Sequence, residues 1–365
     1  MIPIAEPYLN GNEKKYVLQC LETNWISSQG DFILRLEEGL AAYHGVKYGV
    51  VTSSCTTAIH LALKAFNIGP GDEVICPDLT FIAPANMVVL SGAALVLIDV
   101  DPQTLSIDVN KLADKITCKT KAIIVVHQFG HAAPMDEILA IARGHDIKII
   151  EDNAESIGGR YKGRLLGTFG NISCFSFFAN KIITSGEGGA LLTNDEELAD
   201  RCRELRDHGM SKIKKYHHIN LGYNYRMTNI QAAIGLAQLE QLDTILTTRM
   251  EQMCLYYKLL NDIPGISLRR FADWCEPVHW LMTMTIDDYY NRDEFLQFMR
   301  CEGVDCRQMI NPVHRALHFI DKYDESDYPN STRISAQSLH LPCSTSLQKN
   351  QVEFIVEKVK KYFCC

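Results

Sequence analysis

The sequence predicts an α/β protein with two domains: a large domain on a mostly parallel central sheet, and a smaller α+β domain at the C-terminus. Short β-branched runs alternate with helical stretches over the first 200 residues, which is the element order of an α/β domain. The predicted strands are continuous apolar runs, as in parallel strands covered on both faces. After Pro264-Gly265 this alternation stops and a different pattern begins.

The predicted strands of the large domain are short and rich in valine and isoleucine. They are GVVTS (49–53), EVICP (73–77), ALVLIDV (94–100), KAIIVVH (121–127), IKIIED (147–152), ISCFSFF (172–178) and GALLTND (189–195).

Apolar residues at helical spacing fill the intervals between these strands. Helices are expected at 56–66, at about 82–90 and after Pro134. Asn194 is expected to cap a helix that runs to about His208, where Gly209 ends it. A polar loop at 210–222 precedes a long helical pattern from Thr228 into the 250s.

The C-terminal part contains one clear strand and two helical patterns. We expect a strand at 279–287, a helix at 292–302 and an amphipathic helix at 351–363. The predicted domains are therefore 1–245, the large α/β domain, and 246–365, the small α+β domain.

One uncharged stretch, 79–98, is long enough to span a bilayer. It is interrupted by small and polar residues, namely Thr80, Pro84, Asn86, Ser91 and Gly92. We therefore predict a buried helix followed by a buried strand, and no membrane segment.

Charge and cysteine content exclude several classes of protein. The chain carries 36 Lys and Arg against 44 Asp and Glu, a formal charge of −8, so no general basic surface for nucleic acid or an anionic membrane is expected. The 13 cysteines include no CxxC pair, so neither a metal site nor a disulfide scaffold is predicted. The first residues show no secretory pattern. We expect a reduced, cytoplasmic protein with Cys364 and Cys365 as exposed thiols.

Two residues at predicted strand ends carry the main chemical signal. Lys181 follows a strand and lies among Phe177, Phe178, Ile182 and Ile183 in the sequence. Most lysines are solvated surface residues, but an apolar setting favours the neutral amine that Schiff-base chemistry needs.

Asp152 ends a predicted parallel strand, at the edge of an α/β sheet where ligands bind. It could simply cap a loop. Alternatively, it could pair with a protonated ring nitrogen, as pyridoxal phosphate requires.

A strand-to-helix junction supplies a candidate phosphate site. Ser53, Ser54, Thr56 and Thr57 lie where free N–H groups and the helix dipole favour an anion. Taken singly, these residues also suit an ordinary helix cap. Ser176, at the end of a strand, could add a hydroxyl to the same site. Phe81 follows another strand and is either a core aromatic or a ring that stacks on a flat cofactor.

Four segments together resemble the DegT/StrS-type sugar-nucleotide aminotransferases, which use pyridoxal phosphate and have the aspartate aminotransferase fold (fold type I). They are TSSCTTAIHLAL, PDLTFIAPAN, EDNAESIGGRYKGRLLGTFGNISCFSFFANKIITSGEGG and GYNYRMTNIQAAIGLAQL. The resemblance covers nearly the whole chain, and the block from Asp152 to Lys181 is the most specific part.

The resemblance implies a role for each matching residue. Lys181 would bind the cofactor aldehyde and carry protons, and Asp152 would hold the pyridinium nitrogen. The other implied cofactor contacts are Phe81 on the ring, Glu155 near the ring hydroxyl, and Thr56, Cys55 and Ser176 around the phosphate. Asn224 would reach the phosphate from the partner subunit, because the family builds its active sites across a homodimer interface. The residues implied to face the nucleotide sugar are Tyr216, His218, Arg226, Arg307 and His314.

Some of these residues have simpler explanations, and the chain departs from the family at several positions. Arg226 and Arg307 could each form surface ion pairs, and Tyr216 and His218 could pack within a loop. Cys55 stands where the family usually has glycine, so the approach of the backbone to the phosphate is in question. Further departures are Asn153, Ser156 and the HHI sequence at 217–219.

The resemblance implies transfer of an amino group from L-glutamate to a nucleotide-linked 4-keto-6-deoxy hexose, with a GDP-linked 4-amino-4,6-dideoxy sugar as the expected product. Such a sugar would serve the O-antigen of lipopolysaccharide or another surface polysaccharide. UDP- or dTDP-linked keto sugars remain open as substrates. Related dehydratases carry histidine where this chain has Lys181. A non-catalytic cofactor-binding regulator also remains open, whereas a nicotinamide enzyme lacks its GxGxxG signal.

Overall fold

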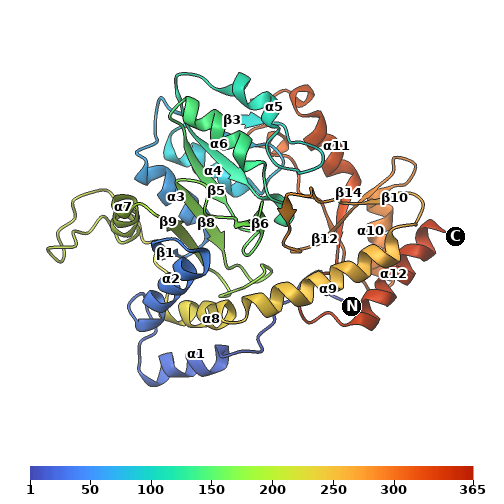
Figure 1. Ribbon diagram of the computed structural model, residues 1–365, viewed down its shortest axis with the longest axis horizontal. Helices are drawn as coiled ribbons and strands as arrows, with labels where there is room; N and C mark the ends of the chain where they lie inside the picture. The colour runs from blue at the N-terminus through green and yellow to red at the C-terminus, as the bar shows by residue number, and fades with distance from the viewer. Residues whose placement is uncertain (365) are drawn as a thin grey trace.

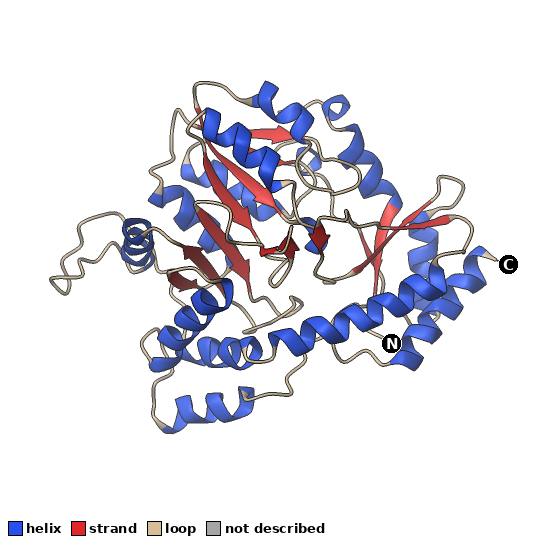
Figure 2. Ribbon diagram, in the orientation of Figure 1, coloured by secondary structure: helices blue, strands red, loops and turns tan. Residues whose placement is uncertain are grey.

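The computed structural model describes residues 1–364, so of the two terminal thiols only Cys364, which is exposed, can be placed. The main body is a seven-stranded sheet with helices on both faces (Figure 1, Figure 2). The strand order is β1-β9-β8-β5-β4-β2-β3. Strands β8, β5, β4, β2 and β3 are parallel, and β9 pairs antiparallel with both β8 and β1.

The predicted strands of this sheet all form, most of them one or two residues shorter than predicted at the carboxyl end. They are β1 (Tyr48–Thr52), β2 (Glu73–Pro77), β3 (Ala94–Ile98), β4 (Thr120–Val126), β5 (Lys148–Asp152), β8 (Ile172–Ser176) and β9 (Gly189–Thr193).

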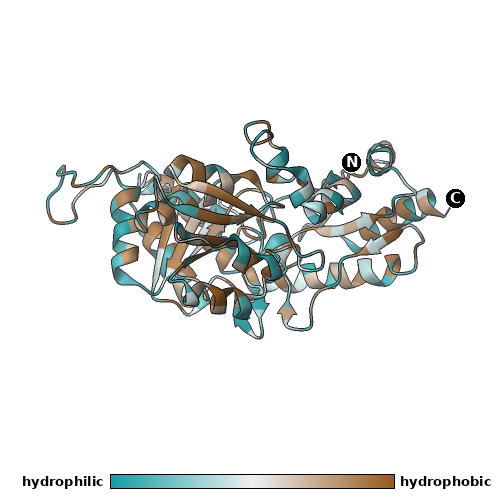
Figure 3. Ribbon diagram, turned by 90° about the horizontal axis from the view of Figure 1, so that it is seen from above, coloured by the Kyte–Doolittle hydropathy of each residue, from teal (hydrophilic) through white to brown (hydrophobic). Residues whose placement is uncertain are grey.

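Alternate residues of these strands enter two different cores, as the two-residue period of a strand requires. Val50 packs in the core beneath α3 (Cys55–Ala65), whereas Val51 packs in the core beneath α2 (Asp31–His44) and α8 (Asn229–Leu239). Both faces of the sheet are therefore buried, and its strands are coloured predominantly hydrophobic in Figure 3. This explains why the strands are continuous apolar runs in the sequence.

The remaining helices of the large body are α1 (Glu13–Glu22), α4 (Ile82–Ser91), α5 (Val109–Leu112), α6 (Met135–Gly144) and α7 (Glu196–Arg206). The short strands β6 (Arg160–Tyr161), β7 (Arg164–Leu165) and β11 (Cys275–Glu276) form a separate antiparallel sheet in the order β11-β6-β7. The uncharged stretch 79–98 forms the predicted helix and strand, α4 and β3. Neither is fully buried as predicted, because Leu90 of α4 is 61% exposed and β3 is an edge strand whose first residues are partly exposed. No helix within residues 1–364 has both the length and the apolar character to cross a membrane.

The C-terminal part of the chain forms a second sheet of four antiparallel strands, in the order β10-β12-β14-β13. The elements of this part are β10 (Ile266–Leu268), β12 (Met282–Ile286), α10 (Arg292–Cys301), β13 (Arg307–Gln308), α11 (Pro329–Gln337), β14 (Ser338–Leu341) and α12 (Lys349–Phe363). Apolar side chains of β10, β12, β14, α10 and α12 form a separate core with the second half of α9 (Leu242–Leu260).

Helix α9 runs from below the large sheet to the small one (Figure 1). Ile245 packs in the core of the large sheet, whereas Met253 and Tyr256 pack in the core of the small sheet. The division into domains at residue 245 stays a prediction, and that residue lies inside α9.

Two details of the predicted helices are wrong. Asp195, not Asn194, caps α7, because the Asp195 side chain accepts the N–H of Leu198 at 3.0 Å while the Asn194 side chain accepts the N–H of Lys47. The long helix after Thr228 is two helices, α8 and α9, interrupted at Glu240 and Gln241.

Candidate active site

A cavity of about 500 Å³ opens at the carboxyl edge of the large sheet, against β13, β14 and the segment before β12. The large domain contributes seven of the predicted site residues to its lining, namely Cys55, Thr56, Phe81, Asp152, Glu155, Ser176 and Lys181. Arg307 enters the same cavity from β13. The carboxyl ends of parallel strands meet at one edge of a sheet, which brings together residues more than 100 positions apart.

Lys181 lies between an acidic and an aromatic side chain. Its Nζ is 3.4 Å from Oε1 of Glu155 and 3.8 Å from the ring centroid of Trp280. Ile182 and Ile183 are buried beside it, as the sequence led us to expect. The setting is not wholly apolar, however, because a carboxylate lies beside the amine.

Asp152 lies at the end of β5 and is 5% exposed. Among the described residues its carboxylate accepts only from the Ala154 N–H, at 3.0 Å, and from the Cys55 thiol, at 3.8 Å. Burial raises the pKa of Asp152 to about 6, against the effect of the Ala154 hydrogen bond. A buried carboxylate without a cationic hydrogen-bond partner suits a ligand that brings a protonated nitrogen.

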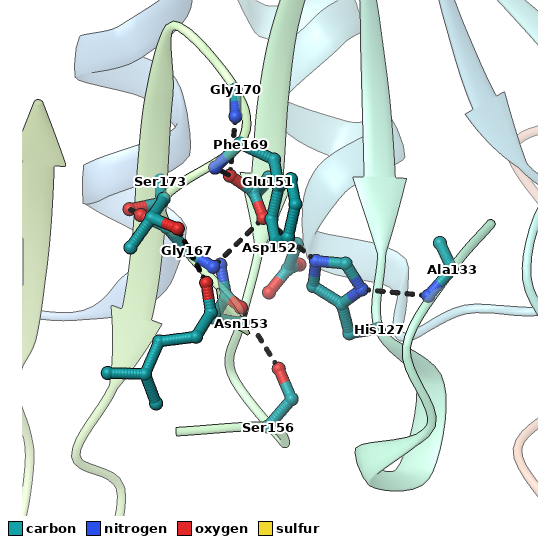
Figure 4. Close-up of polar contacts among 12 residues, drawn as sticks. His127, Ala133, Glu151, Asp152, Asn153, Ser156, Gly167, Phe169, Gly170 and Ser173 are labelled. Carbon is teal, nitrogen blue, oxygen red and sulfur yellow. Dashed lines mark hydrogen bonds and ion pairs between the residues drawn. The ribbon is translucent and has the colours of Figure 1, made fainter. Parts of the chain in front are cut away.

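The neighbouring Glu151 fixes the strand end that carries Asp152 (Figure 4). Its carboxylate accepts three N–H groups of the loop 167–170 at 2.6–2.9 Å and His127 Nε2 at 3.0 Å. The Ala133 N–H donates to Nδ1 of His127, which leaves the ring proton on Nε2. Burial alone would raise the pKa of Glu151, but these hydrogen bonds hold it below its usual value.

The start of α3 forms an open anion cradle. Ser54 and Thr57 satisfy each other in a capping box. No acceptor in the described part of the chain reaches the N–H groups of Cys55 and Thr56, and both residues line the cavity. The Cys55 side chain points to Asp152 and not toward the two N–H groups. Cysteine in place of the family's usual glycine therefore does not block access to them.

A neighbouring glycine, which sequence reasoning missed, permits this close packing. A Cβ on Gly189 would lie 2.4–2.6 Å from backbone atoms of Ser54 and Cys55. Only glycine therefore allows β9 to approach the start of α3. Ser176, at the end of β8, also faces the cavity, and its Oγ accepts the Phe178 N–H at 3.3 Å.

Phe81 immediately precedes α4 as its N-cap residue and lines the cavity, with 62% of the residue exposed. Trp280 was missed by sequence reasoning, because an aromatic residue before a strand has no distinctive spacing. Its Nε1 donates to the Asn180 carbonyl at 2.7 Å, which fixes the indole beside Lys181.

Four predicted site residues lie outside the cavity, on the segment 207–226. Tyr216 is 77% exposed, and His218 Nδ1 lies 2.9 Å from the His208 carbonyl oxygen. Arg226 pairs with Asp207 at 3.0 Å and donates to Asn224 at 2.9 Å. Part of this segment projects beyond α7, at the left of Figure 1. Their predicted roles are therefore not met within one chain.

His314 is not brought to the cavity either. It is 3% exposed, its Nδ1 lies 2.7 Å from Oδ2 of Asp78, and its ring stacks on Tyr328. Its contact with a nucleotide sugar stays a prediction, and in one chain the ring faces Asp78 instead.

Comparison with known proteins decides the family. The model of the DegT/DnrJ/EryC1/StrS aminotransferase family matches residues 7–360. The chain belongs to this family. The predicted resemblance and the predicted enzyme class are thereby confirmed.

Individual relatives match over almost the full length. GDP-perosamine synthase of Caulobacter vibrioides is 45% identical over 358 residues, which is 97% of this chain and 96% of the relative. GDP-perosamine synthase of Escherichia coli O157:H7 is 39% identical over 362 residues, which is 99% of this chain and 98% of the relative.

The solved structure of Spr1654 from Streptococcus pneumoniae in its PLP form superposes with a TM-score of 0.94 at 26% identity, covering 99% of this chain and 98% of that chain. The predicted fold type I architecture is confirmed. The protein is an aminotransferase that uses pyridoxal phosphate, as the sequence predicted.

The residues at the cavity fit this cofactor. Asp152 offers a buried carboxylate, the start of α3 offers two open N–H groups, and Lys181 offers an amine. These three groups match the ring nitrogen, the phosphate and the aldehyde of pyridoxal phosphate.

Proposed function

We propose that the protein transfers an amino group from L-glutamate to C4 of a GDP-linked 4-keto-6-deoxy hexose, giving 2-oxoglutarate and a GDP-linked 4-amino-4,6-dideoxy hexose of the perosamine type. The full-length relatives named GDP-perosamine synthase support this substrate. The observation that carries the chemistry is the placement of Lys181 and Asp152 at one cavity. The product would serve the synthesis of a surface polysaccharide.

Bound pyridoxal phosphate supplies an electron sink that stabilises negative charge on a carbon next to nitrogen. The protein's part is to hold that sink and to move protons. Asp152 would keep the ring nitrogen protonated, since a buried carboxylate pairs best with a cation. Cys55 and Thr56 would bind the phosphate through their N–H groups, with Ser176 adding a hydroxyl. The Phe81 ring would cover one face of the cofactor.

Lys181 would be the residue attached to the cofactor at rest, and its amine would carry a proton between the reacting carbons. When the amine is free, Glu155 at 3.4 Å and the Trp280 ring at 3.8 Å hold it at the cavity. A charge-assisted hydrogen bond and a cation–π contact both favour this position. Arg307, at the mouth of the same cavity, would meet the anionic groups of glutamate and of the nucleotide in turn.

We further propose a homodimer that completes each site with the partner's segment 207–226. Large apolar side chains stand exposed on this segment, with Ile213 98% and Leu221 85% exposed. Such exposure is typical of a surface that packs against another chain. Asn224 would then reach the partner's phosphate site, and Tyr216, His218 and Arg226 the partner's nucleotide sugar.

Turnover with a panel of substrates tests this function. Purified protein with glutamate should aminate a GDP-linked 4-keto-6-deoxy hexose at least tenfold faster than its UDP- and dTDP-linked counterparts. Faster turnover of a UDP- or dTDP-linked sugar would move the substrate to that class. Bound cofactor that does not respond to glutamate would favour a regulator, and loss of a hydroxyl without amination would favour a dehydratase.

Oligomeric state is a separate test. Equilibrium sedimentation should give twice the chain mass. A monomer would remove the proposed contribution of Asn224, Tyr216, His218 and Arg226 to a neighbouring site.

A further inference from the structure

The tight turn Gln128–Gly130 after β4 forms one wall of the active-site cavity. Phe129 adopts the left-handed conformation, with φ 49° and ψ 36°, which is unfavourable for a residue with a side chain. Gly130 follows with φ 79°, and a Cβ there would lie 1.8 Å from the Val278 carbonyl oxygen. The surrounding structure must therefore hold this turn in place.

Arg269, just after β10, is the side chain that does so. Its Nη1 donates to the carbonyl oxygens of Gln128, at 3.0 Å, and Phe129, at 3.4 Å. Its Nη2 donates to the Thr104 carbonyl at 2.6 Å. All these partners are backbone carbonyls and none is a carboxylate. The guanidinium thus fixes both peptide groups of the turn from outside the cavity.

The inner side of the same turn faces the reacting groups. The Phe129 N–H donates to Oε2 of Glu155 at 2.8 Å, and Oε1 of that carboxylate lies 3.4 Å from Lys181 Nζ. The turn is therefore rigidly connected to the amine on which the chemistry depends.

Gln128 leaves a polar group unsatisfied at this position. The residue is 1% exposed and lines the cavity, yet its Nε2 forms no hydrogen bond within residues 1–364. Buried polar side chains nearly always have a partner. The unpaired Nε2 is itself covered, so the amide has to turn toward the cavity, where a bound ligand can supply the missing acceptor.

We propose that Gln128 hydrogen-bonds the sugar of the nucleotide-sugar substrate, and that Arg269 is the positioning residue that fixes it there. This inference rests on the proposed function. A neutral carboxamide donates and accepts, which suits the hydroxyl and carbonyl oxygens of a sugar. The charged groups of the cofactor have other partners at the cavity, in Asp152 and the start of α3. Gln128 instead precedes Phe129, whose N–H donates to Glu155, and it lines the same cavity as the Glu155–Lys181 pair, where the reacting sugar carbon must approach.

Binding measurements on the holoenzyme of Gln128→Leu test the assignment. Calorimetry with the cofactor in its pyridoxal form, so that no amino group is available for transfer, compares GDP with the GDP-linked keto sugar. We expect the keto sugar to bind about five- to tenfold more weakly than to wild type, the range for one lost hydrogen bond. GDP should bind within about twofold of wild type, and glutamate should change the cofactor absorption at the wild-type rate.

Gln252→Leu is the matched control. Gln252 is also buried, but it lies on α9 outside the cavity and donates to the Leu347 carbonyl at 2.8 Å. It loses a buried carboxamide without touching the site, so its ligand binding should match wild type.

Arg269→Met should reproduce the selective loss of sugar binding, and Arg269→Lys should restore part of it. Arg203→Met controls for these, because Arg203 also donates to a backbone carbonyl, that of Gly49, away from the cavity.

Unchanged sugar binding in Gln128→Leu would overturn the proposal, as would an equal loss for GDP. A slower response to glutamate or a loss of cofactor would assign Gln128 to the cofactor instead. Failure of the wild-type protein to bind the GDP-linked sugar at all would contradict the proposed function, and is thereby distinguishable from a failure of this inference.

Discussion

The amine of Lys181 lies 3.4 Å from one oxygen of Glu155, and the other oxygen of that carboxylate accepts the Phe129 N–H at 2.8 Å. The carboxylate is therefore fixed by the backbone before it meets the amine. Glu155 can hold Lys181 at the cavity without being free to turn away.

We expect Glu155→Gln to retain the cofactor but lower kcat about tenfold. The substitution keeps the shape but only one acceptor oxygen. If that oxygen accepts the Phe129 N–H, the amide NH2 faces Lys181 and the charge-assisted hydrogen bond to the amine is lost. Absorbance of the bound cofactor and steady-state kinetics check the two halves of this expectation. Loss of cofactor together with activity would show that Glu155 serves binding rather than the free amine.

Asp152→Asn should lower kcat at least about thirtyfold, because it removes a buried charge from the partner of the ring nitrogen. The variant keeps the acceptor for the Ala154 N–H, so the fold should persist. Single-turnover kinetics with glutamate measures the loss directly. A variant with wild-type rate would exclude Asp152 as the ring partner.

The same substitution should stabilise the cofactor-free protein at neutral pH. The folded state holds the Asp152 proton up to a pKa of about 6, whereas an unfolded chain releases it near 4. Wild-type stability should therefore fall as pH rises from about 4 to 6, and this contribution to the variant's advantage should reach about 2–3 kcal/mol at pH 7. Urea unfolding at pH 4 and pH 7 checks it, and a constant difference would contradict it.

Cys55 should contribute to the cofactor site through its thiol. Burial raises the pKa of Cys55 well above its usual value, so the group stays a neutral donor to Asp152 at 3.8 Å. We expect Cys55→Ala to weaken cofactor retention about threefold and Cys55→Ser to restore it, since serine keeps a donor. Equilibrium dialysis of the cofactor measures both. Equal cofactor retention by the wild type and both variants would show that Cys55 only fills space and does not support the cofactor site.

The hydrogen bonds of the Glu151 carboxylate, here called the Glu151 clamp, should contribute strongly to the free energy of unfolding. Glu151→Ala leaves three N–H groups of the loop 167–170 and Nε2 of His127 without their acceptor. Breaking a buried charged network costs about 3–5 kcal/mol of unfolding free energy. Glu353→Ala is the control, because its pair with Lys349 is exposed and should cost below about 1 kcal/mol. Similar losses in both variants would refute the clamp.

The sequence alone was enough to predict the ends of the strands and most of the reactive residues located there. Asp152, Ser176 and Lys181 end or follow apolar runs, and the geometry of a parallel sheet brings such positions to one edge. Their proximity therefore follows from local pattern plus topology. The placement of Lys181 and Asp152 at one site could be predicted without any information about the small domain.

Gln128, Arg269 and Trp280 could not be found in this way. Gln128 and Arg269 are separated by 141 residues in the chain and meet only through the packing of the two sheets. Their residue types carry no spacing signal, and Gly130 marks the turn without revealing that Phe129 before it also adopts the left-handed conformation. The sequence also could not decide between two adjacent cap candidates. Asn194 and Asp195 can each cap a helix, and only the structure shows that Asp195 caps α7.

The prediction of one long helix after Thr228 was wrong because local pattern again did not distinguish two arrangements. The apolar spacing continues through Glu240 and Gln241, so the pattern does not reveal the break between α8 and α9. The proposed contribution of segment 207–226 to a neighbouring subunit could not be derived from local pattern either, because it depends on contacts that a single chain does not make.

Borohydride reduction of the purified holoenzyme, followed by peptide mass mapping, tests the central claim most directly. Reduction fixes the link between the cofactor and the amine that holds it. We predict one pyridoxyl group per chain, located on Lys181 and absent from the Lys181→Ala variant. Attachment to another lysine, or no attachment at all in a cofactor-loaded protein, would contradict the proposed site.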